Sequence, residues 1–101
     1  VRVADIVWIE AQGNYVALRT AAHTLLHRVP LSRLEAHLDP AQFVRVHRGA
    51  IVRSGHASSL RVGGDGSYTL HLRDGTAVPV SARYADAARA LLQDGPAPQL
   101  S

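Results

Sequence analysis

One short apolar segment, Phe43 to Arg53 (FVRVHRGAIVR), holds three arginines and a histidine on or beside a predicted strand. In an enzyme a histidine more often stands beside a carboxylate or a nucleophile, whereas the neighbours of His47 add positive charge. Such a group of fixed cations suits an anionic polymer better than a small substrate. The alternative is a strand edge whose arginines serve only solubility, and this segment alone leaves both interpretations open.

Two other polar segments carry donor-rich side chains. Gln12-Gly13-Asn14-Tyr15 contains a predicted turn, because Gly and Asn tolerate positive φ. Ser81-Ala82-Arg83-Tyr84 opens a predicted helix, with Ser81 as its N-cap and Arg83 in a first turn whose free N–H groups favour an anion such as phosphate. The alternative for Arg83 is an ordinary surface pair with Asp86. Asn and Arg side chains read adenine and guanine, so loops at one edge of a β scaffold would suit consecutive grooves of DNA.

Other kinds of chemistry find little support. Gly63-Gly64-Asp65-Gly66 lacks the Lys-Ser/Thr and the helix that follow a phosphate-binding loop, and is typical of a hairpin turn. His23 and His27 stand four residues apart, which on a strand separates them by roughly 13 Å and disfavours a shared metal ion. No G-x-S-x-G segment indicates a hydrolase. We therefore expect no catalysis, no metal and no cofactor.

The composition indicates one folded domain. Hydrophobic residues make up 47% of the 101 positions, and no apolar run approaches the roughly 20 residues that cross a bilayer. The absence of cysteine fits a reducing cytoplasm, and the missing initiating methionine suggests a domain cut from a longer protein. All 11 Lys and Arg positions are arginine. The guanidinium fork suits guanine edges and phosphates, but the codon bias of a GC-rich genome is the larger cause, so the missing lysine by itself says little about function.

Periodicity and turn signals predict a mostly β fold. A short middle helix over residues 31–38 is expected to begin with a capping box of Ser32 and Glu35 and to end at Asp39-Pro40. A second helix closes the chain from Ser81 onward. The predicted strands cover residues 6–11, 15–20, 23–29, 43–46, 50–52, 56–62, 67–73 and 77–80.

Several of these segments, taken in order, make the chain resemble the LytTR DNA-binding domain, which is found at the C-terminus of many bacterial response regulators. The resemblance runs from about Ile6 to Leu92. It rests on IVWIEAQGNYV at 6–16, LSRLEAHL at 31–38, FVRVHR at 43–48, Asp74-Gly75, and VPVSARY at 78–84.

The resemblance implies an elongated fold of small antiparallel sheets whose loops enter successive major grooves of double-stranded DNA. By position, base contacts then come from Asn14 or Tyr15 in the first hairpin, from Arg48 and from Arg83. For the histidine before Arg48 we favour a structural role, as a buried side chain that orients its loop. The residues expected to contact phosphates or to position the loops are Arg45, His47, Arg53, Arg61 and Ser81.

The resemblance also implies partners. Pairs of such domains typically bind repeated half-sites, and the N-terminal neighbour in the full-length protein is commonly a receiver domain. We expect the DNA-binding domain to cover residues 1–93, with a tail or linker at 94–101, and we expect no membrane contact. Gly49, Arg53 and Ala82 depart from the family's usual Ser, Asn and Arg, which affects the target sequence more than the binding mode.

The competing interpretation is a β-rich protein-interaction module whose arginines pair with an acidic partner. Salt dependence does not separate the two interpretations, since both kinds of binding are electrostatic. Sequence preference on duplex DNA does separate them. A third interpretation, a small hydrolase, rests on nothing more than the available side chains.

Overall fold

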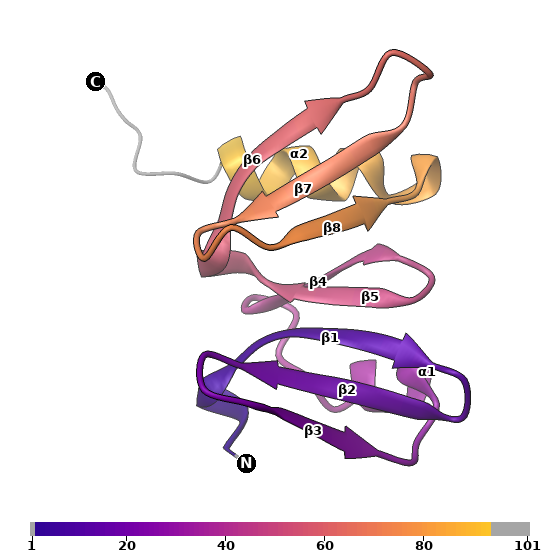
Figure 1. Ribbon diagram of the computed structural model, residues 1–101, viewed down its shortest axis with the longest axis vertical. Coiled ribbons are helices and arrows are strands. Elements are labelled where there is room, and N and C mark those ends of the chain that lie inside the picture. Colours follow the sequence, from indigo (N-terminus) through magenta and orange to yellow (C-terminus); the bar gives the residue numbers. More distant parts are fainter. Residues whose placement is uncertain (1, 94–101) are drawn as a thin grey trace.

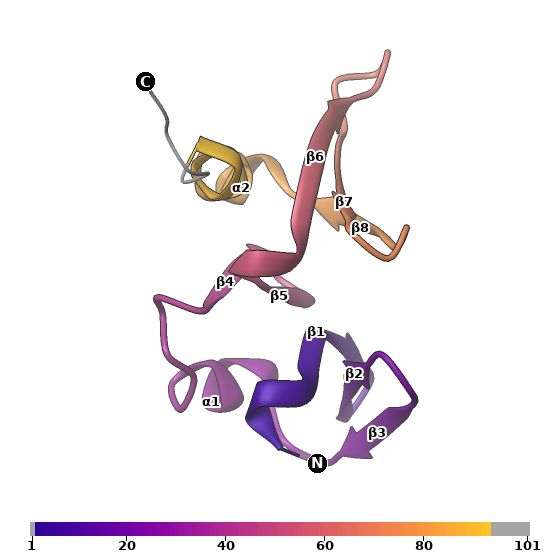
Figure 2. The same cartoon turned by 90° about the vertical axis from the view of Figure 1, so that its left-hand side faces the viewer.

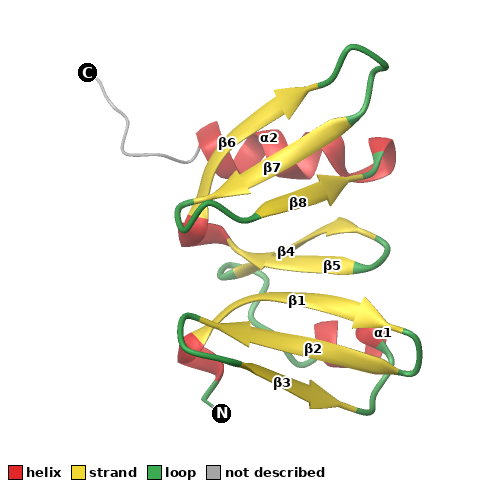
Figure 3. Ribbon diagram, viewed as in Figure 1, coloured by secondary structure: helices red, strands yellow, loops and turns green. Residues whose placement is uncertain are grey.

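Eight strands form two antiparallel sheets within residues 2–93, the part of the chain that the computed structural model describes (Figure 1 and Figure 3). The first sheet has the order β3-β2-β1-β5-β4 and the second the order β6-β7-β8. The predicted mostly β fold with a middle helix and a C-terminal helix is confirmed. The bounds are β1 Ile6–Gln12, β2 Tyr15–Thr20, β3 Thr24–His27, α1 Leu31–Glu35, β4 Phe43–His47, β5 Ala50–Arg53, β6 Ala57–Val62, β7 Tyr68–Leu72, β8 Ala77–Val80 and α2 Ala85–Gln93. Short 3-10 turns cover Val3–Asp5, Ser54–His56 and Ala82–Tyr84.

The two sheets follow one another along the long axis of the molecule, which measures 43 × 31 × 24 Å (Figure 1). Figure 2 shows both helices on the same side, α1 beside the first sheet and α2 beside the second. The elongated arrangement expected from the resemblance is therefore present. The predicted tail at 94–101 lies outside the described residues.

Strand β1 contributes to two hydrophobic cores, and a β-bulge in its pairing with β2 between Ile6 and Trp8 decides which residues face each core. Strict alternation would set Ile6 and Trp8 on one face, but the extra residue lets Val7 and Trp8 share one core and Ile6 and Ile9 the other. The inter-sheet core consists of Val7, Trp8, Val46, Ala50, Val52, Leu70, Leu72, Val78, Val80 and Ala88. The α1 core consists of Ile6, Ile9, Val16, Leu31, Phe43 and Ile51.

The third strand is shorter than predicted, since β3 covers Thr24–His27 rather than residues 23–29. The Thr20 hydroxyl accepts hydrogen bonds from the backbone N–H groups of Ala22 and His23, at 3.2 and 3.1 Å. These local hydrogen bonds hold Ala22 and His23 in a turn, so the strand begins one residue later than predicted, at Thr24.

The middle helix is also shorter than predicted, and its expected capping box is wrong. Pro30 occupies the N-cap position, Ser32 lies inside the helix, and no side chain caps the first turn. Beyond Glu35 the chain continues to Leu38 in the tighter turns of a 3-10 helix, whose hydrogen bonds span three residues; Leu38 N–H, for example, donates to Glu35 O at 3.1 Å. The spacing of apolar residues therefore predicted helical turns over 31–38, but the α-helix itself ends at Glu35.

The Gly63-Gly64-Asp65-Gly66 segment closes the hairpin of β6 and β7, as predicted, and Asp74-Gly75 lies in the turn between β7 and β8. Gly66 (φ 85°) and Gly75 (φ 92°) adopt the left-handed conformation that favours glycine. Hydrogen bonds from the side chain and backbone of Ser67 lower the pKa of Asp65, and those from Thr76 lower the pKa of Asp74. Both carboxylates stabilise their turns by accepting hydrogen bonds from backbone N–H groups.

Candidate nucleic-acid interface

Three polar loops lie along one edge of the molecule, one after another in the direction of its long axis (Figure 1). They are the β1–β2 turn, the β4–β5 turn and the connection from β8 to the 3-10 turn before α2. We call residues 13–15, 47–49 and 81–84 the loop edge. It contains no Asp or Glu, so no carboxylate within these loops opposes an approaching anion.

Two backbone hydrogen bonds join the neighbouring loops near their bases. Ala11 N–H donates to Gly49 O at 2.8 Å, and Ser81 N–H donates to Val46 O at 3.1 Å. Because backbone atoms form both bonds, the fold itself sets the spacing of the three loops. The structure thus brings together the predicted base-contact residues of three distant segments.

The first loop is a two-residue turn between Gln12 and Tyr15. Gly13 alone takes a positive φ (60°), as in a type II′ turn that has glycine first. Asn14 is exposed, and Tyr15 keeps 43% of its surface exposed. The hairpin therefore presents an amide in its turn and a partly exposed phenol at the start of β2.

Arg28 stands beside this first loop and was missed in the sequence analysis. Pairing of β3 with β2 sets His27 opposite Val16, so Arg28 follows beside Tyr15. Arg28 is exposed and lines an open cleft of about 440 Å³ together with Asn14 and Tyr15. The sequence predicted strands at 15–20 and 23–29. Pairing them as a hairpin would have set Arg28 beside Tyr15 and so identified it.

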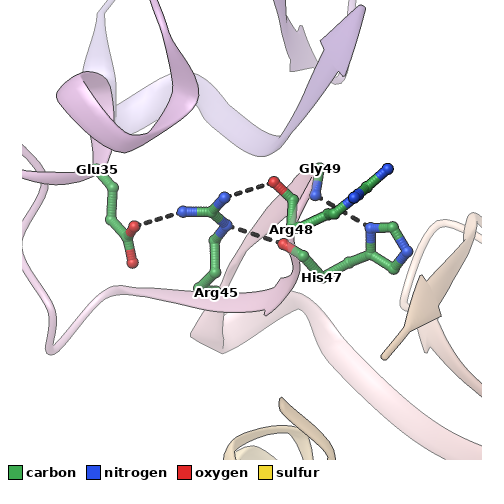
Figure 4. Close-up of polar contacts among 5 residues, drawn as sticks. All are labelled: Glu35, Arg45, His47, Arg48 and Gly49. Carbon is green, nitrogen blue, oxygen red and sulfur yellow. Dashed lines mark hydrogen bonds and ion pairs between the residues drawn. The ribbon is translucent and has the colours of Figure 1, made fainter. Parts of the chain in front are cut away.

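The second loop presents Arg48 from a distorted strand end. The pairing of β4 with β5 shifts between Arg45 and His47, a bulge of the kind that re-aims side chains near functional loops. His47 is half-buried, and its Nδ1 atom accepts a hydrogen bond from Gly49 N–H at 3.0 Å. Arg48 is exposed, and its side chain points away from Arg45 (Figure 4).

Arg45 lies behind the second loop, and its guanidinium contacts are with the protein itself (Figure 4). Nη1 donates to Glu35 at 2.6 Å, Nε donates to His47 O at 2.8 Å, and Nη2 donates to Arg48 O. Only 16% of the side chain is exposed. Of the two roles expected for Arg45, these contacts correspond to positioning the loop.

Arg53 stands at the end of β5 that is remote from the second loop. Its Nε donates to Ile6 O at 2.7 Å, its Nη2 donates to Val3 O at 2.5 Å, and its guanidinium lies 4.5 Å from the centre of the Phe43 ring. Arg53 thereby fastens the N-terminal turn onto the first sheet. It does not belong to the loop edge.

The third loop differs from the expected capped helix. The Ser81 side chain makes no capping hydrogen bond; instead Ser81 O accepts one from Tyr84 N–H at 2.9 Å, and α2 begins only at Ala85. Among the ion pairs of residues 2–93, Asp86 pairs with Arg89 at 2.7 Å and not, as the alternative from the sequence had it, with Arg83. Arg83 is exposed, with its guanidinium 5.6 Å from the Tyr84 ring centre.

The ion pairs show which arginines have a carboxylate partner. Four form among residues 2–93, and they engage Arg2, Arg19, Arg45 and Arg89. The arginines of the loop edge, Arg48 and Arg83, are outside these pairs. Arg61 is also outside these pairs. It is exposed on β6, whose preceding residue Leu60 packs against the inter-sheet core.

The described residues offer neither a metal site nor a membrane-spanning helix. Within 2–93, no group of three or more His, Asp or Glu side chains is placed to hold a metal ion. None of the helices there combines the length and the apolar character needed to cross a membrane.

Comparisons with known proteins bear on the same region. Residues 1–93 match the model of a family described as the LytTr DNA-binding domain. The chain is 32% identical over 93 residues to the sensory transduction protein LytT of Bacillus anthracis, covering 92% of this chain and 38% of that protein. It is 33% identical over 90 residues to the positive alginate biosynthesis regulatory protein of Pseudomonas aeruginosa, covering 87% of this chain and 36% of that protein. The chain therefore spans little more than a third of the length of these relatives.

A solved structure, a LytTr DNA-binding domain from Bacillus cereus, superimposes with a TM-score of 0.79 at 28% identity, covering 91% of this chain and 84% of that one. The fold and the family match thus agree over nearly the whole described region. The chain belongs to the LytTR family of DNA-binding domains, which occur in response-regulator-type transcription regulators of bacteria.

Proposed function

We propose that the loop edge reads the sequence of double-stranded DNA by inserting its three loops into successive major grooves. The observation that carries this proposal is the row of three donor-rich loops tied to one another by backbone hydrogen bonds. One helical turn of B-DNA is about 34–36 Å long. The 43 Å length of the molecule is enough to follow a duplex from one major groove to the next.

The side chains of the loop edge have the chemistry for base readout. Arg48 and Arg83 offer paired donors to the O6 and N7 atoms of guanine, and Asn14 can pair with the edge of adenine. Tyr15 offers one hydroxyl. In this proposal the phosphate contacts that supply affinity come from Arg61, Arg28 and the Ser81 hydroxyl. Both arginines are exposed and stand outside the four ion pairs of the described residues, and Arg28 and Ser81 lie at or beside the loops.

The full-length protein is proposed to be a cytoplasmic two-component response regulator in which this domain is the output module. The LytT relatives are described as sensory transduction proteins, and the chain covers only 38% of the first of them. A pair of domains would bind repeated half-sites, and the receiver domain would control their pairing.

The test is selection of duplexes from a randomised pool, followed by methylation interference on the selected sequence. Methylation of guanine N7 blocks the major groove, so we expect interference at two or more sites spaced by about one helical turn. Retention of DNA without an enriched sequence, or interference confined to the minor groove, would contradict the proposal. No retention would favour the competing interpretation, a module that binds an acidic protein.

A further inference from the structure

We infer that Glu35 and Arg45 form a positioning pair that fixes the Arg48 loop for base readout, an inference that rests on the proposed function. Neither residue needs to touch DNA for this role. Glu35 ends helix α1, ten residues before Arg45 in the chain, and the two meet only because α1 packs against the first sheet.

The geometry of Arg45 explains why the pair acts on the loop. Its Nε and Nη2 groups donate to the carbonyl oxygens of His47 and Arg48, the two residues at the start of the turn (Figure 4). Its Nη1 donates to Glu35 at 2.6 Å. The planar guanidinium thus connects α1 to two consecutive peptide groups, and its rigid fork sets their orientation.

Burial adds to this argument. The Arg45 side chain is 16% exposed, whereas that of Glu35 is 43% exposed. A charged side chain that is largely buried needs a partner, so loss of Glu35 would leave Arg45 free to reorient and to release the carbonyls. The turn is closed on its other side by the bond from Gly49 N–H to His47 Nδ1. Arg48 is therefore held at the turn by contacts on both sides.

The experiment uses Glu35→Gln and Glu35→Ala as a matched pair. Both variants remove one negative charge, so a purely electrostatic effect raises DNA affinity equally in both. Only Glu35→Ala also removes the oxygen that accepts the Arg45 hydrogen bond. We expect Glu35→Ala to lose about fivefold or more of the preference for the selected duplex over a scrambled one, relative to Glu35→Gln. Equal preference in the two variants would overturn the inference.

Arg45→Met distinguishes positioning from direct phosphate contact. A positioning role predicts weaker binding to the selected duplex only, with an unchanged dependence on salt. Equal loss on both duplexes, with a salt slope lower by about one unit, would show that Arg45 contacts phosphate and would overturn the inference.

A readout without DNA separates this inference from the proposed function. In Glu35→Ala, but not in Glu35→Gln, we expect the amide NMR signals of Arg48 and Gly49 to shift while the melting temperature shows that the domain is still folded. Unchanged signals would overturn the positioning role alone. A wild-type domain that selects no DNA sequence would instead overturn the proposed function.

Discussion

Four of the eleven arginines illustrate two different uses of the same side chain. Arg45 and Arg53 donate to backbone carbonyl groups and hold segments of the chain together. Arg48 and Arg83 are exposed on the loop edge and take no part in the ion pairs of the described residues. The same fork of donors thus serves the fold in one group, and we propose that it serves base readout in the other.

Arg48 and Arg61 are expected to differ when each is replaced by alanine. Arg48→Ala should weaken binding to the selected duplex by about 1–3 kcal/mol and leave non-specific binding nearly unchanged, because a base contact is lost. Arg61→Ala should weaken both and lower the salt slope by about one unit. Titrations at several salt concentrations measure both quantities. If Arg48→Ala weakened specific and non-specific binding as Arg61→Ala does, Arg48 would be a phosphate contact and not a base contact.

Gly49 is expected to tolerate serine. An added Cβ would lie 3.6 Å from His47 Nδ1 and 3.8 Å from the Ala11 Cβ, which are ordinary van der Waals distances, and Gly49 is not among the glycines with positive φ. Gly49→Ser should raise the free energy of unfolding by ~0.5 kcal/mol, because serine has less conformational entropy than glycine in the unfolded chain. Its hydroxyl should also strengthen binding to any duplex. Gly13→Ser is the control and should destabilise, because φ is 60° there; equal melting temperatures in the two variants would contradict this account.

At the scale of secondary-structure elements, each loop is positioned by a distortion or contact at its base. A tight turn at Gly13 ends the first hairpin, a bulge precedes His47, and a 3-10 turn separates β8 from α2. The backbone bonds from Ala11 and Ser81 then fix the loops relative to one another. The loop edge is therefore a property of several elements and not of any one motif.

Ser81 tests the bond between the second and third loops. Its φ of −80° and the extended strand before it are compatible with proline, but proline lacks the N–H that donates to Val46 O. Ser81→Pro should lower the free energy of unfolding by about 1–3 kcal/mol and weaken DNA binding. Ser81→Ala keeps the N–H and should leave stability within ~0.5 kcal/mol, since the hydroxyl caps nothing. Chemical denaturation of both variants makes the comparison, and equal destabilisation would contradict this role of the backbone bond.

Sequence periodicity predicted the strands and turns well, because alternation and glycine turns are local signals. The range 77–80 was predicted correctly. Helix starts were predicted poorly, since at Ser81 a backbone carbonyl takes the role assigned to the side chain. The pairing of Arg45 with Glu35 depends on how α1 packs, and such a tertiary contact leaves no pattern in the sequence. Residue types singled out the three loops, the family resemblance assigned base contacts to Asn14 or Tyr15, Arg48 and Arg83, and the structure shows that the loops share one edge (Figure 1).

At the scale of the whole molecule, the two cores share the strands of the first sheet. Val52 faces the inter-sheet core while its neighbour Ile51 faces the α1 core. The single tryptophan, Trp8, lies in the inter-sheet core on the same strand as Ile9 of the α1 core. Neither core can open without disturbing these strands, so the domain should unfold as one unit.

This cooperativity predicts a single transition for variants in either core. Leu70→Ala should cost ~2–5 kcal/mol, and Ile9→Val should cost ~0.5–1.5 kcal/mol, because both side chains are fully buried. In each variant, Trp8 fluorescence and far-UV circular dichroism should give coincident denaturation curves. Separate midpoints for the two probes would show that the halves of the molecule unfold independently.

The most direct test of sequence reading by the loop edge is parallel selection from one randomised duplex pool with the wild-type domain and with Arg48→Ala, at about 0.15 M salt. The wild-type domain should enrich a motif, and Arg48→Ala should enrich the same motif with discrimination lost at one base position of each half-site. An unchanged motif would show that Arg48 reads no base. The absence of any enriched motif with the wild-type domain would contradict sequence reading by this edge altogether.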